Sequence, residues 1–183
     1  MVGMSSSVLR GREWSRADLA ELPDDGHRYE VLDGALVVTP SPTSDHQFAL
    51  FALYRQLIAA CPRSLRVVGA PLDVTLSDDS VLQPDLLVGE VQRFGPRGLA
   101  GRPELAVEVL SPGSQVVDRN LKFERYERAG TPAYWLADPD VLTLTAYELR
   151  EGRFALVAQV SGQEFWTATV PYEVTITPGA WLD

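Results

Sequence analysis

The chain has 183 residues, of which 45% are hydrophobic and 22% charged, and these are ordinary values for one globular domain with a sizeable core. The formal net charge of −9 argues against a protein that coats nucleic acid by bulk attraction, although an enzyme can still meet phosphate through a bound metal ion. We therefore expect a single domain over 1–183, with 1–12 as the segment that is a candidate for disorder.

The compartment is indicated by what the sequence lacks. No apolar run approaches the length of a membrane span, and the Ser-rich start lacks the apolar stretch of a signal peptide. Cys61 is the only cysteine and ends an apolar helical run, so we expect it to pack in or near the core. Since a lone cysteine cannot form an internal disulfide, we expect a cytoplasmic protein with no membrane contact.

The N-terminal third carries two local signals. Ser15 and Asp18 have the spacing of a capping box, which predicts a short helix that stops before the next proline. Further on, the pair Asp33-Gly34 separates two apolar runs within 29–38. Such a pair is a strong hairpin signal, so we expect two antiparallel strands there.

A longer helix and a series of short strands follow. Ser44 is the expected N-cap of a helix over about 45–60, whose apolar residues keep the 3.6-residue period that indicates packing on a sheet. After this helix, short β-branched or leucine-rich runs alternate with Gly, Pro and Asp, which predicts successive strands. These runs are LRVVG (65–69), PLDVTL (71–76) and DLLVG (85–89).

The segment 92–103 is rich in Gly and Pro and contains Arg93, Arg97 and Arg102 but no acidic residue. A solvated loop is the simplest interpretation. Because the loop is basic and directly precedes a central strand, it is also the best candidate for contact with phosphate.

Two acidic residues stand where a buried strand should be apolar. The segment ELAVEVL (104–110) is typical of a central strand, with Glu108 on the face shared by Ala106 and Leu110. A lone buried carboxylate is costly unless it is paired or bound to metal. Asp85 begins the preceding strand, and two such acids on adjacent strands would form a hard-oxygen site suited to Mg²⁺.

The helix expected over about 117–129, ending at Gly130, brings a lysine toward these acids. At 100° per residue, Lys122 and Tyr126 share one side of this helix with Arg119, Phe123 and Ala129, while Asn120, Glu124, Glu127 and Arg128 share the other. We expect the first side to pack inward. A lysine on such a face commonly extends to water, but this helix directly follows the Glu108 strand, so an inward Lys122 could reach the carboxylates.

The C-terminal part predicts a strand at AYWLAD (133–138) and then a β-meander over 142–181 with a turn at Ser161-Gly162. Tyr134 and Trp135 are expected in the core. The whole pattern predicts an α/β fold: a mixed central β-sheet flanked by helices, with a C-terminal β-meander.

The ordered set of motifs resembles a large bacterial family of restriction-endonuclease-like proteins within the PD-(D/E)XK nuclease superfamily. Other catalytic patterns do not match, because the chain has no nucleophile elbow, no phosphate-binding loop and only two histidines. The resemblance spans nearly the whole domain. It rests on RYEVLDGALVV (28–38), PSPTSDHQ (40–47), VLQPDLLVG (81–89), ELAVEVLSPGS (104–114), DRNLKFERYERAGTPAYWLADPD (118–140) and the closing meander.

This resemblance implies a restriction-endonuclease-like fold and hydrolysis of phosphodiester bonds, in DNA, with Mg²⁺ or Mn²⁺ as cofactor and a homodimer as the assembly. Asp85 and Glu108 would bind the metal, the backbone carbonyl of Val109 would be a further ligand, and Glu30 would be an accessory acid near it. His46 lies within a matching stretch, but we assign it no role.

Two positions depart from the superfamily pattern. The usual lysine stands two residues after the strand acid, where this chain has Leu110; the resembling family is taken to have moved it to the next helix, which matches the catalytic candidate Lys122. The family hairpin usually reads Asp-Gly-Glu, whereas this chain has Ala35, and a site that needs that glutamate would be weakened.

Two other interpretations stay open. The chain could be an inactive nuclease-like fold that binds nucleic acid or a protein partner, which the acidic charge and Ala35 favour. It could also be a structural homodimer in which Asp85 and Glu108 form ion pairs.

Overall fold

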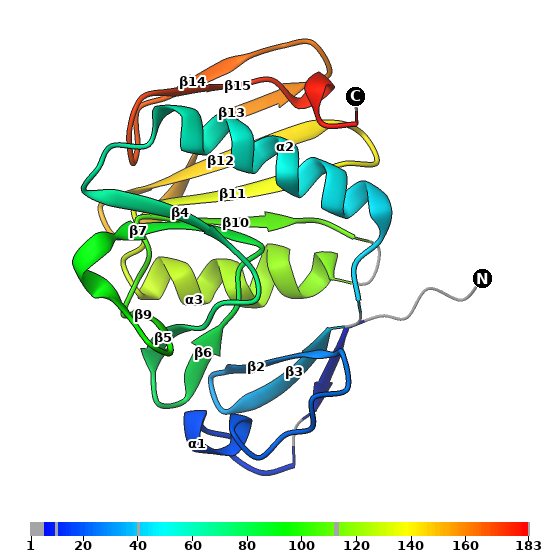
Figure 1. The fold of residues 1–183 in the computed structure, drawn as a ribbon, viewed down its shortest axis with the longest axis vertical. Helices are drawn as coiled ribbons and strands as arrows, with labels where there is room; N and C mark the ends of the chain where they lie inside the picture. Colours follow the sequence, from blue (N-terminus) through cyan, green and yellow to red (C-terminus); the bar gives the residue numbers. More distant parts are fainter. Residues whose placement is uncertain (1–5, 10, 40, 112–113, 183) are drawn as a thin grey trace.

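The computed structural model describes residues 6–9, 11–39, 41–111 and 114–182. A six-stranded mixed sheet forms its centre, and helices lie on both faces of this sheet (Figure 1). The N-terminal strands and the C-terminal hairpin lie at opposite ends of the long axis (Figure 1). The expected α/β architecture is therefore confirmed.

The central sheet has the strand order β13-β12-β11-β10-β7-β4, and β10 is parallel to β11 while all its other pairings are antiparallel. The strand predicted to be central, β10, lies between β7 and β11, and all five of its residues are buried. The strands are β4 (Leu65–Gly69), β7 (Leu86–Glu90), β10 (Leu105–Val109), β11 (Ala133–Asp138), β12 (Thr143–Arg150) and β13 (Arg153–Ser161).

A second sheet, which the sequence did not predict, has the order β1-β3-β2-β6-β5-β9-β8. The expected hairpin is its β2–β3 pair, and Asp33 and Gly34 form the turn with φ angles of 48° and 73°. Such left-handed angles explain why this turn uses an Asp-Gly pair. The strands are β1 (Ser7–Leu9), β2 (Arg28–Leu32), β3 (Ala35–Thr39), β5 (Val74–Ser77), β6 (Ser80–Leu82), β8 (Phe94–Gly95) and β9 (Gly98–Ala100), and the 3₁₀ turn η1 (Val91–Arg93) precedes β8.

Within the segment 1–12, which was a candidate for disorder, residues 7–9 form strand β1. Strand β1 pairs antiparallel with β3, placing Val8 opposite Val37. Residues 1–5 and 10 lie outside the described residues. The short helix α1 (Arg16–Leu19) follows, and the carboxylate of Asp18 accepts hydrogen bonds from the backbone N–H and hydroxyl of Ser15, which confirms the capping position.

Helix α2 (Ser44–Ala60) covers one face of the central sheet (Figure 1). Leu53 and Leu57 are fully buried there with Val107 and Trp135. The predicted cap was one residue late: Thr43, not Ser44, is the N-cap, and its hydroxyl accepts from the backbone N–H of His46. Cys61 is half-buried at the C-terminal end of this helix, as expected.

The predicted helix over 117–129 begins with π-helical turns, η2 (Val117–Lys122), and continues as α3 (Phe123–Arg128), with Gly130 after it at a φ of 76°. The wider i→i+5 turn changes which side chains share a side. Lys122 and Tyr126 face inward as predicted, but Arg119 is exposed and pairs with Asp138. The 100° period was therefore wrong for Arg119.

The predicted strand over 133–138 is β11, and within the predicted meander over 142–181 the strands β12 and β13 continue the central sheet through antiparallel pairings. The last part of that range instead forms a separate two-stranded sheet, β14 (Trp166–Ala168) with β15 (Val174–Ile176), before the 3₁₀ turn η3 (Pro178–Ala180). Tyr134 and Trp135 are fully buried, as expected for core residues. Among the described residues, no helix has both the length and the apolar character needed to cross a membrane.

Candidate active site

Asp85 and Glu108 are brought together by the register of two adjacent strands. Strands β7 and β10 are antiparallel, with Val107 opposite Leu86. One further step along this register places Glu108 opposite Asp85. Strand β7 begins at Leu86, so Asp85 lies just before it. The Asp85 carboxylate accepts a hydrogen bond from the backbone N–H of Val109 at 2.8 Å. The prediction that the two acids occupy neighbouring positions on adjacent strands agrees with this geometry.

The two faces of β10 divide as the alternation predicted. Val107 and Val109 pack in the core under α2, whereas Ala106 and Leu110 pack on the side of η2 and α3. Glu108 shares this second side and is only 1% exposed. Its carboxylate therefore faces the helix that carries Lys122.

The ammonium of Lys122 lies among three carboxylates. Its Nζ is 3.0 Å from Oε1 of Glu30, 3.2 Å from Oε1 of Glu108 and 3.7 Å from Oδ1 of Asp118. Lys122 itself is 3% exposed, so the charge does not extend to water. It is also the only lysine among the 16 Lys and Arg residues of the chain.

Asp118 is a site residue that the sequence did not reveal. It is 3% exposed and lies on the same side of the helix as Lys122. Asp118 precedes Lys122 by four residues, a spacing that brings two side chains together on a helix, and this spacing is the signal that could have revealed it.

Both oxygens of Asp85 already have partners in the structure. Oδ1 accepts from Nη1 of Arg28 at 2.8 Å, and Oδ2 lies 3.1 Å from Nε2 of His46 besides the Val109 N–H. Burial raises the pKa of Asp85, but the hydrogen bond to His46 and the charge of Arg28 outweigh it, so the pKa is lowered below its usual value. The sequence did not predict Arg28 as a site residue and gave no role to His46, yet both contact this candidate metal ligand.

Glu30 projects from the hairpin into the same cluster. Its Oε1 accepts the backbone N–H of Gln83 at 2.7 Å as well as facing Lys122, and the residue is fully buried. Ala35, at the position where the family hairpin usually has a glutamate, lies opposite Leu32. Leu32 is two residues from Glu30 along β2, a separation of about 7 Å in a strand. Asp33 at the turn pairs with Arg125 and Arg128, so the tip of the hairpin contacts α3.

Burial dominates the pKa values of Glu108 and Asp118. It raises the pKa of Glu108 well above its usual value, because the charge of Lys122 offsets only part of the desolvation. Burial likewise raises the pKa of Asp118 to about 6. Burial lowers the pKa of Lys122, but the carboxylates of Glu108 and Glu30 outweigh it, and the net pKa lies above the usual value. Lys122 therefore remains an ammonium ion.

The donor set fits a hard divalent cation. Among the described residues, Oε2 of Glu30 is a buried oxygen without a hydrogen-bond partner, and Oε1 of Glu108 faces the ammonium of Lys122 at 3.2 Å. In the cluster, the four carboxylates of Glu30, Asp85, Glu108 and Asp118 outnumber the cations Arg28 and Lys122 by two. Within the part of the chain that is described, no three His, Cys, Asp or Glu side chains are arranged to hold a metal together. Two carboxylates are nevertheless sufficient for Mg²⁺, which keeps several waters.

These residues line a cavity of about 460 Å³ that we call the site cavity. Asp85, Glu108, Asp118 and Lys122 contribute to its wall, together with Arg28 and His46. A concave space of this size beside buried, perturbed acids is typical of an active site.

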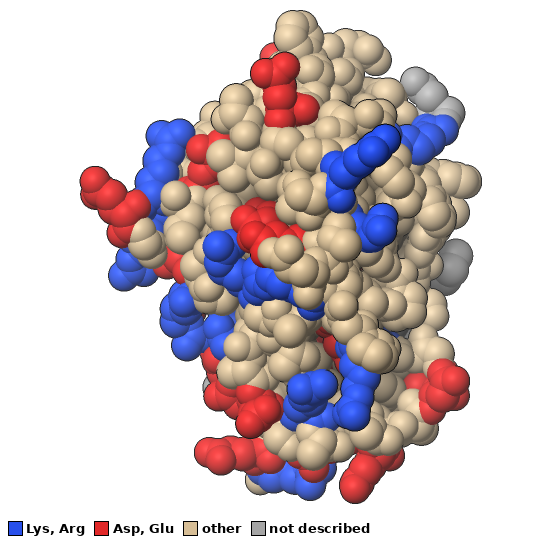
Figure 2. Space-filling view, turned by 60° about the vertical axis from the view of Figure 1, so that its left-hand side comes forward, with Lys and Arg blue, Asp and Glu red and all other residues tan. Residues whose placement is uncertain are grey.

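The basic loop is not part of this cavity. Arg93 donates to the carbonyl of Ala100, and Arg102 pairs with Glu104 at 3.1 Å. Arg97 is exposed. On the face shown in Figure 2, basic and acidic side chains are interspersed. The loop arginines that form these contacts stabilise their own turn, and their contact with phosphate stays a prediction.

The fold and the site together define a restriction-endonuclease-like class: acids on two adjacent strands of a mixed sheet, with a lysine on the helix that follows. A family model described as "Uma2: Putative restriction endonuclease" matches residues 16–179, and the chain belongs to this family. The fold is similar to a crystal structure from Anabaena variabilis ATCC 29413 described as a putative nuclease belonging to DUF820. The TM-score is 0.65 at 20% identity, covering 82% of this chain and 85% of that one. No curated protein matches the chain.

Proposed function

We propose that this protein is a Mg²⁺-dependent endonuclease that hydrolyses phosphodiester bonds in DNA. The observation that carries the proposal is the convergence of Asp85, Glu108 and Lys122 on one cavity. Membership of the restriction endonuclease family supports it. Mn²⁺ is the alternative metal, and a homodimer in the cytoplasm remains the expected setting.

Asp85 and Glu108 would hold the metal, with the carbonyl of Val109 as a further ligand. When bound, Mg²⁺ supplies the Lewis acidity that polarises a phosphate and acidifies a water. The protein contributes position and charge: Glu30 and Asp118 fix the ammonium of Lys122 beside Glu108. From there, Lys122 can orient a water or stabilise the negative charge that develops on phosphoryl oxygens.

The test is cleavage of supercoiled and single-stranded DNA with and without Mg²⁺. We expect Glu108→Gln and Lys122→Ala to lose at least about 100-fold in rate, as for removal of one electrostatic catalytic group. Glu104→Gln is the matched control, because Glu104 precedes the same strand and pairs with Arg102 outside the site cavity. Equal residual activity in the wild type and Glu108→Gln would refute hydrolysis at this site.

A second candidate is a nuclease-like fold that binds nucleic acid or a protein without cutting. The specific observation in its favour is that both oxygens of Asp85 are already engaged by Arg28, His46 and the Val109 N–H. Calorimetric titration with Mg²⁺ or Mn²⁺ separates the two candidates, since absence of binding at millimolar metal favours the second.

In the structural interpretation, Asp85 and Glu108 only form ion pairs, and the structure contains such pairs. The ion pairs Arg28–Asp85 and Lys122–Glu108 are present. Two observations favour a functional site over it: the adjoining cavity, and the buried Oε2 of Glu30, which has no hydrogen-bond partner among the described residues.

A further inference from the structure

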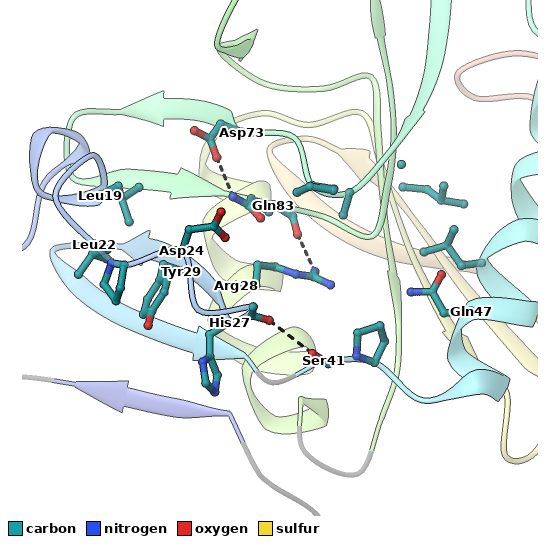
Figure 3. Close-up of a pocket in the computed structure, with 18 of the residues that line it drawn as sticks. Leu19, Leu22, Asp24, His27, Arg28, Tyr29, Ser41, Gln47, Asp73 and Gln83 are labelled. Carbon is teal, nitrogen blue, oxygen red and sulfur yellow. Dashed lines mark hydrogen bonds between the residues drawn. The ribbon is translucent and has the colours of Figure 1, made fainter.

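A second and larger cavity adjoins the site cavity. It has a volume of about 750 Å³, and we call it the side cleft (Figure 3). The side cleft and the site cavity share the wall residues Gly26, His27, Arg28, Ser41 and Pro42. The two spaces therefore adjoin along these residues, so a chain molecule bound at Asp85 and Glu108 would meet the side cleft next to Arg28.

The side cleft has two walls rich in apolar and aromatic surface. In Figure 3, Leu19, Leu22 and Tyr29 lie on one side, and Gln47 of α2 lies on the other. The hydroxyl of Tyr29 donates to Asp25 at 2.8 Å, so the ring is held in place at its tip. The wall formed by α2 consists of Gln47, Leu50, Phe51 and Tyr54.

The charge of the side cleft is unsuited to a phosphate backbone. Among the described residues that line it, Arg28 is the only Lys or Arg, and its guanidinium is bound to Asp85 and to the carbonyl of Gln83. Asp24 and Asp73 also line the side cleft. Because a duplex is held by several cations on its phosphates, this surface does not fit a duplex backbone.

A nucleobase, in contrast, matches what the side cleft offers. A base is uncharged and presents a π-face that stacks on aromatic side chains whatever its identity. Tyr29 and Tyr54 supply such rings from the two walls. Gln47 and Asp24 supply polar groups that can meet the edge of a base.

We propose that the side cleft binds an unpaired nucleotide of the DNA substrate, so that the scissile phosphate lies at the Asp85–Glu108 site. The substrate class is then single-stranded DNA, or a duplex with a frayed or flipped nucleotide. The inference rests on the proposed function, because it assigns the chemistry to the site cavity. Arg28 stands at the junction, where its guanidinium can meet the phosphate between the two spaces.

The test compares binding of a labelled single strand and a blunt duplex by fluorescence anisotropy. The full chain is used with Ca²⁺ as the metal, the oligonucleotide has about ten nucleotides, and a gel verifies that it stays intact. We expect the single strand to bind at least about tenfold more tightly than the duplex. Tyr29→Ala and Tyr54→Ala should each weaken binding of the single strand by about tenfold, the loss of one stacked base.

Two further variants control for structure. Tyr29→Phe keeps the ring and should bind the single strand more tightly than Tyr29→Ala does, since stacking needs the π-face. Phe165→Ala removes an aromatic residue that is 70% exposed but does not line the side cleft, and it should leave binding unchanged.

The outcomes separate this inference from the proposed function. Equal affinity for both DNA forms, no binding of either, or no effect of Tyr29→Ala and Tyr54→Ala would overturn the side cleft as a nucleotide site, even if Mg²⁺-dependent cleavage is observed. Tight binding of the single strand that depends on both tyrosines supports the side cleft even if no cleavage is observed, in which case only the hydrolysis fails.

Discussion

The guanidinium of Arg28 lies 2.8 Å from Oδ1 of Asp85, so an ion pair already occupies one oxygen of a candidate metal ligand. The side chain of Arg28 is 17% exposed and lines both cavities. A metal that binds Asp85 must therefore compete with Arg28, or share the carboxylate with it. The same arginine is then freed to face a phosphate.

This competition predicts that Arg28→Gln binds Mg²⁺ or Mn²⁺ more tightly than the wild type. A hydrogen bond to a charged group contributes about 1.5–3 kcal/mol, so we expect at least about a tenfold gain in affinity by calorimetry. Arg125→Gln is the control, because Arg125 bonds Ser77, Ser80 and Asp33 but not Asp85. An unchanged or weaker metal affinity of Arg28→Gln would show that Arg28 does not compete.

Lys122 neutralises a buried acidic cluster, and its removal should destabilise the fold. We expect Lys122→Met to lower the free energy of unfolding by about 3–5 kcal/mol at pH 7 in chelator, because it leaves Glu30, Glu108 and Asp118 without their shared cation. Urea denaturation measures this. Arg119→Met removes a cation that is 44% exposed, and it should change stability by no more than about 1 kcal/mol. Comparable losses in the two variants would contradict the buried-cluster interpretation.

The raised pKa of Asp118, about 6 against 3.8, predicts how stability depends on pH. Between these values the folded state binds more protons than the unfolded state, so the free energy of unfolding falls as pH rises through this window. Glu108, whose pKa is also raised by burial, acts in the same direction, while the lowered pKa of Asp85 acts mainly below pH 4.

Asp118→Asn should therefore flatten the decline between pH 4.5 and 7 by about 2 kcal/mol, the part of a shift of this size that falls within that window. The measurement is the urea midpoint at both pH values in chelator. Asp140→Asn is the control, since Asp140 is exposed. A slope equal to that of the wild type would mean that Asp118 titrates as an ordinary carboxyl group.

The N-cap of α2 gives a prediction that separates two adjacent residues. The hydroxyl of Thr43 caps the helix by accepting from the N–H of His46, whereas Ser44 is already the first helical residue. We expect Thr43→Ala to cost about 1 kcal/mol and Ser44→Ala much less. Thermal unfolding of both variants checks this, and the reverse order would restore Ser44 as the cap.

Much of the fold could be predicted from the sequence, because the responsible signals are local. The Asp33-Gly34 pair specifies a turn with left-handed φ angles, and the period-two alternation of β10 placed Glu108 on the face opposite Val107 and Val109. The helical side carrying Lys122 and Tyr126 was also correctly identified. One further local signal was not used: Lys122 is the only lysine among the basic residues.

The site itself was decided by the tertiary structure. Glu108 lies opposite Asp85 only because β7 and β10 are antiparallel neighbours in one particular register, and register depends on long-range pairing. Arg28 and His46 reach Asp85 from separations of 57 and 39 residues along the chain. Arg119 leaves the inward side because η2 is π-helical, which the 100° period does not describe.

The sequence by itself therefore determined the pair of acids and the lysine as candidates, since an isolated charge in an apolar pattern is visible residue by residue. Only the tertiary structure showed which groups surround them and that two cavities meet at Arg28. The physical reason is that burial and electrostatic coupling depend on distances across space, which the order of residues does not specify.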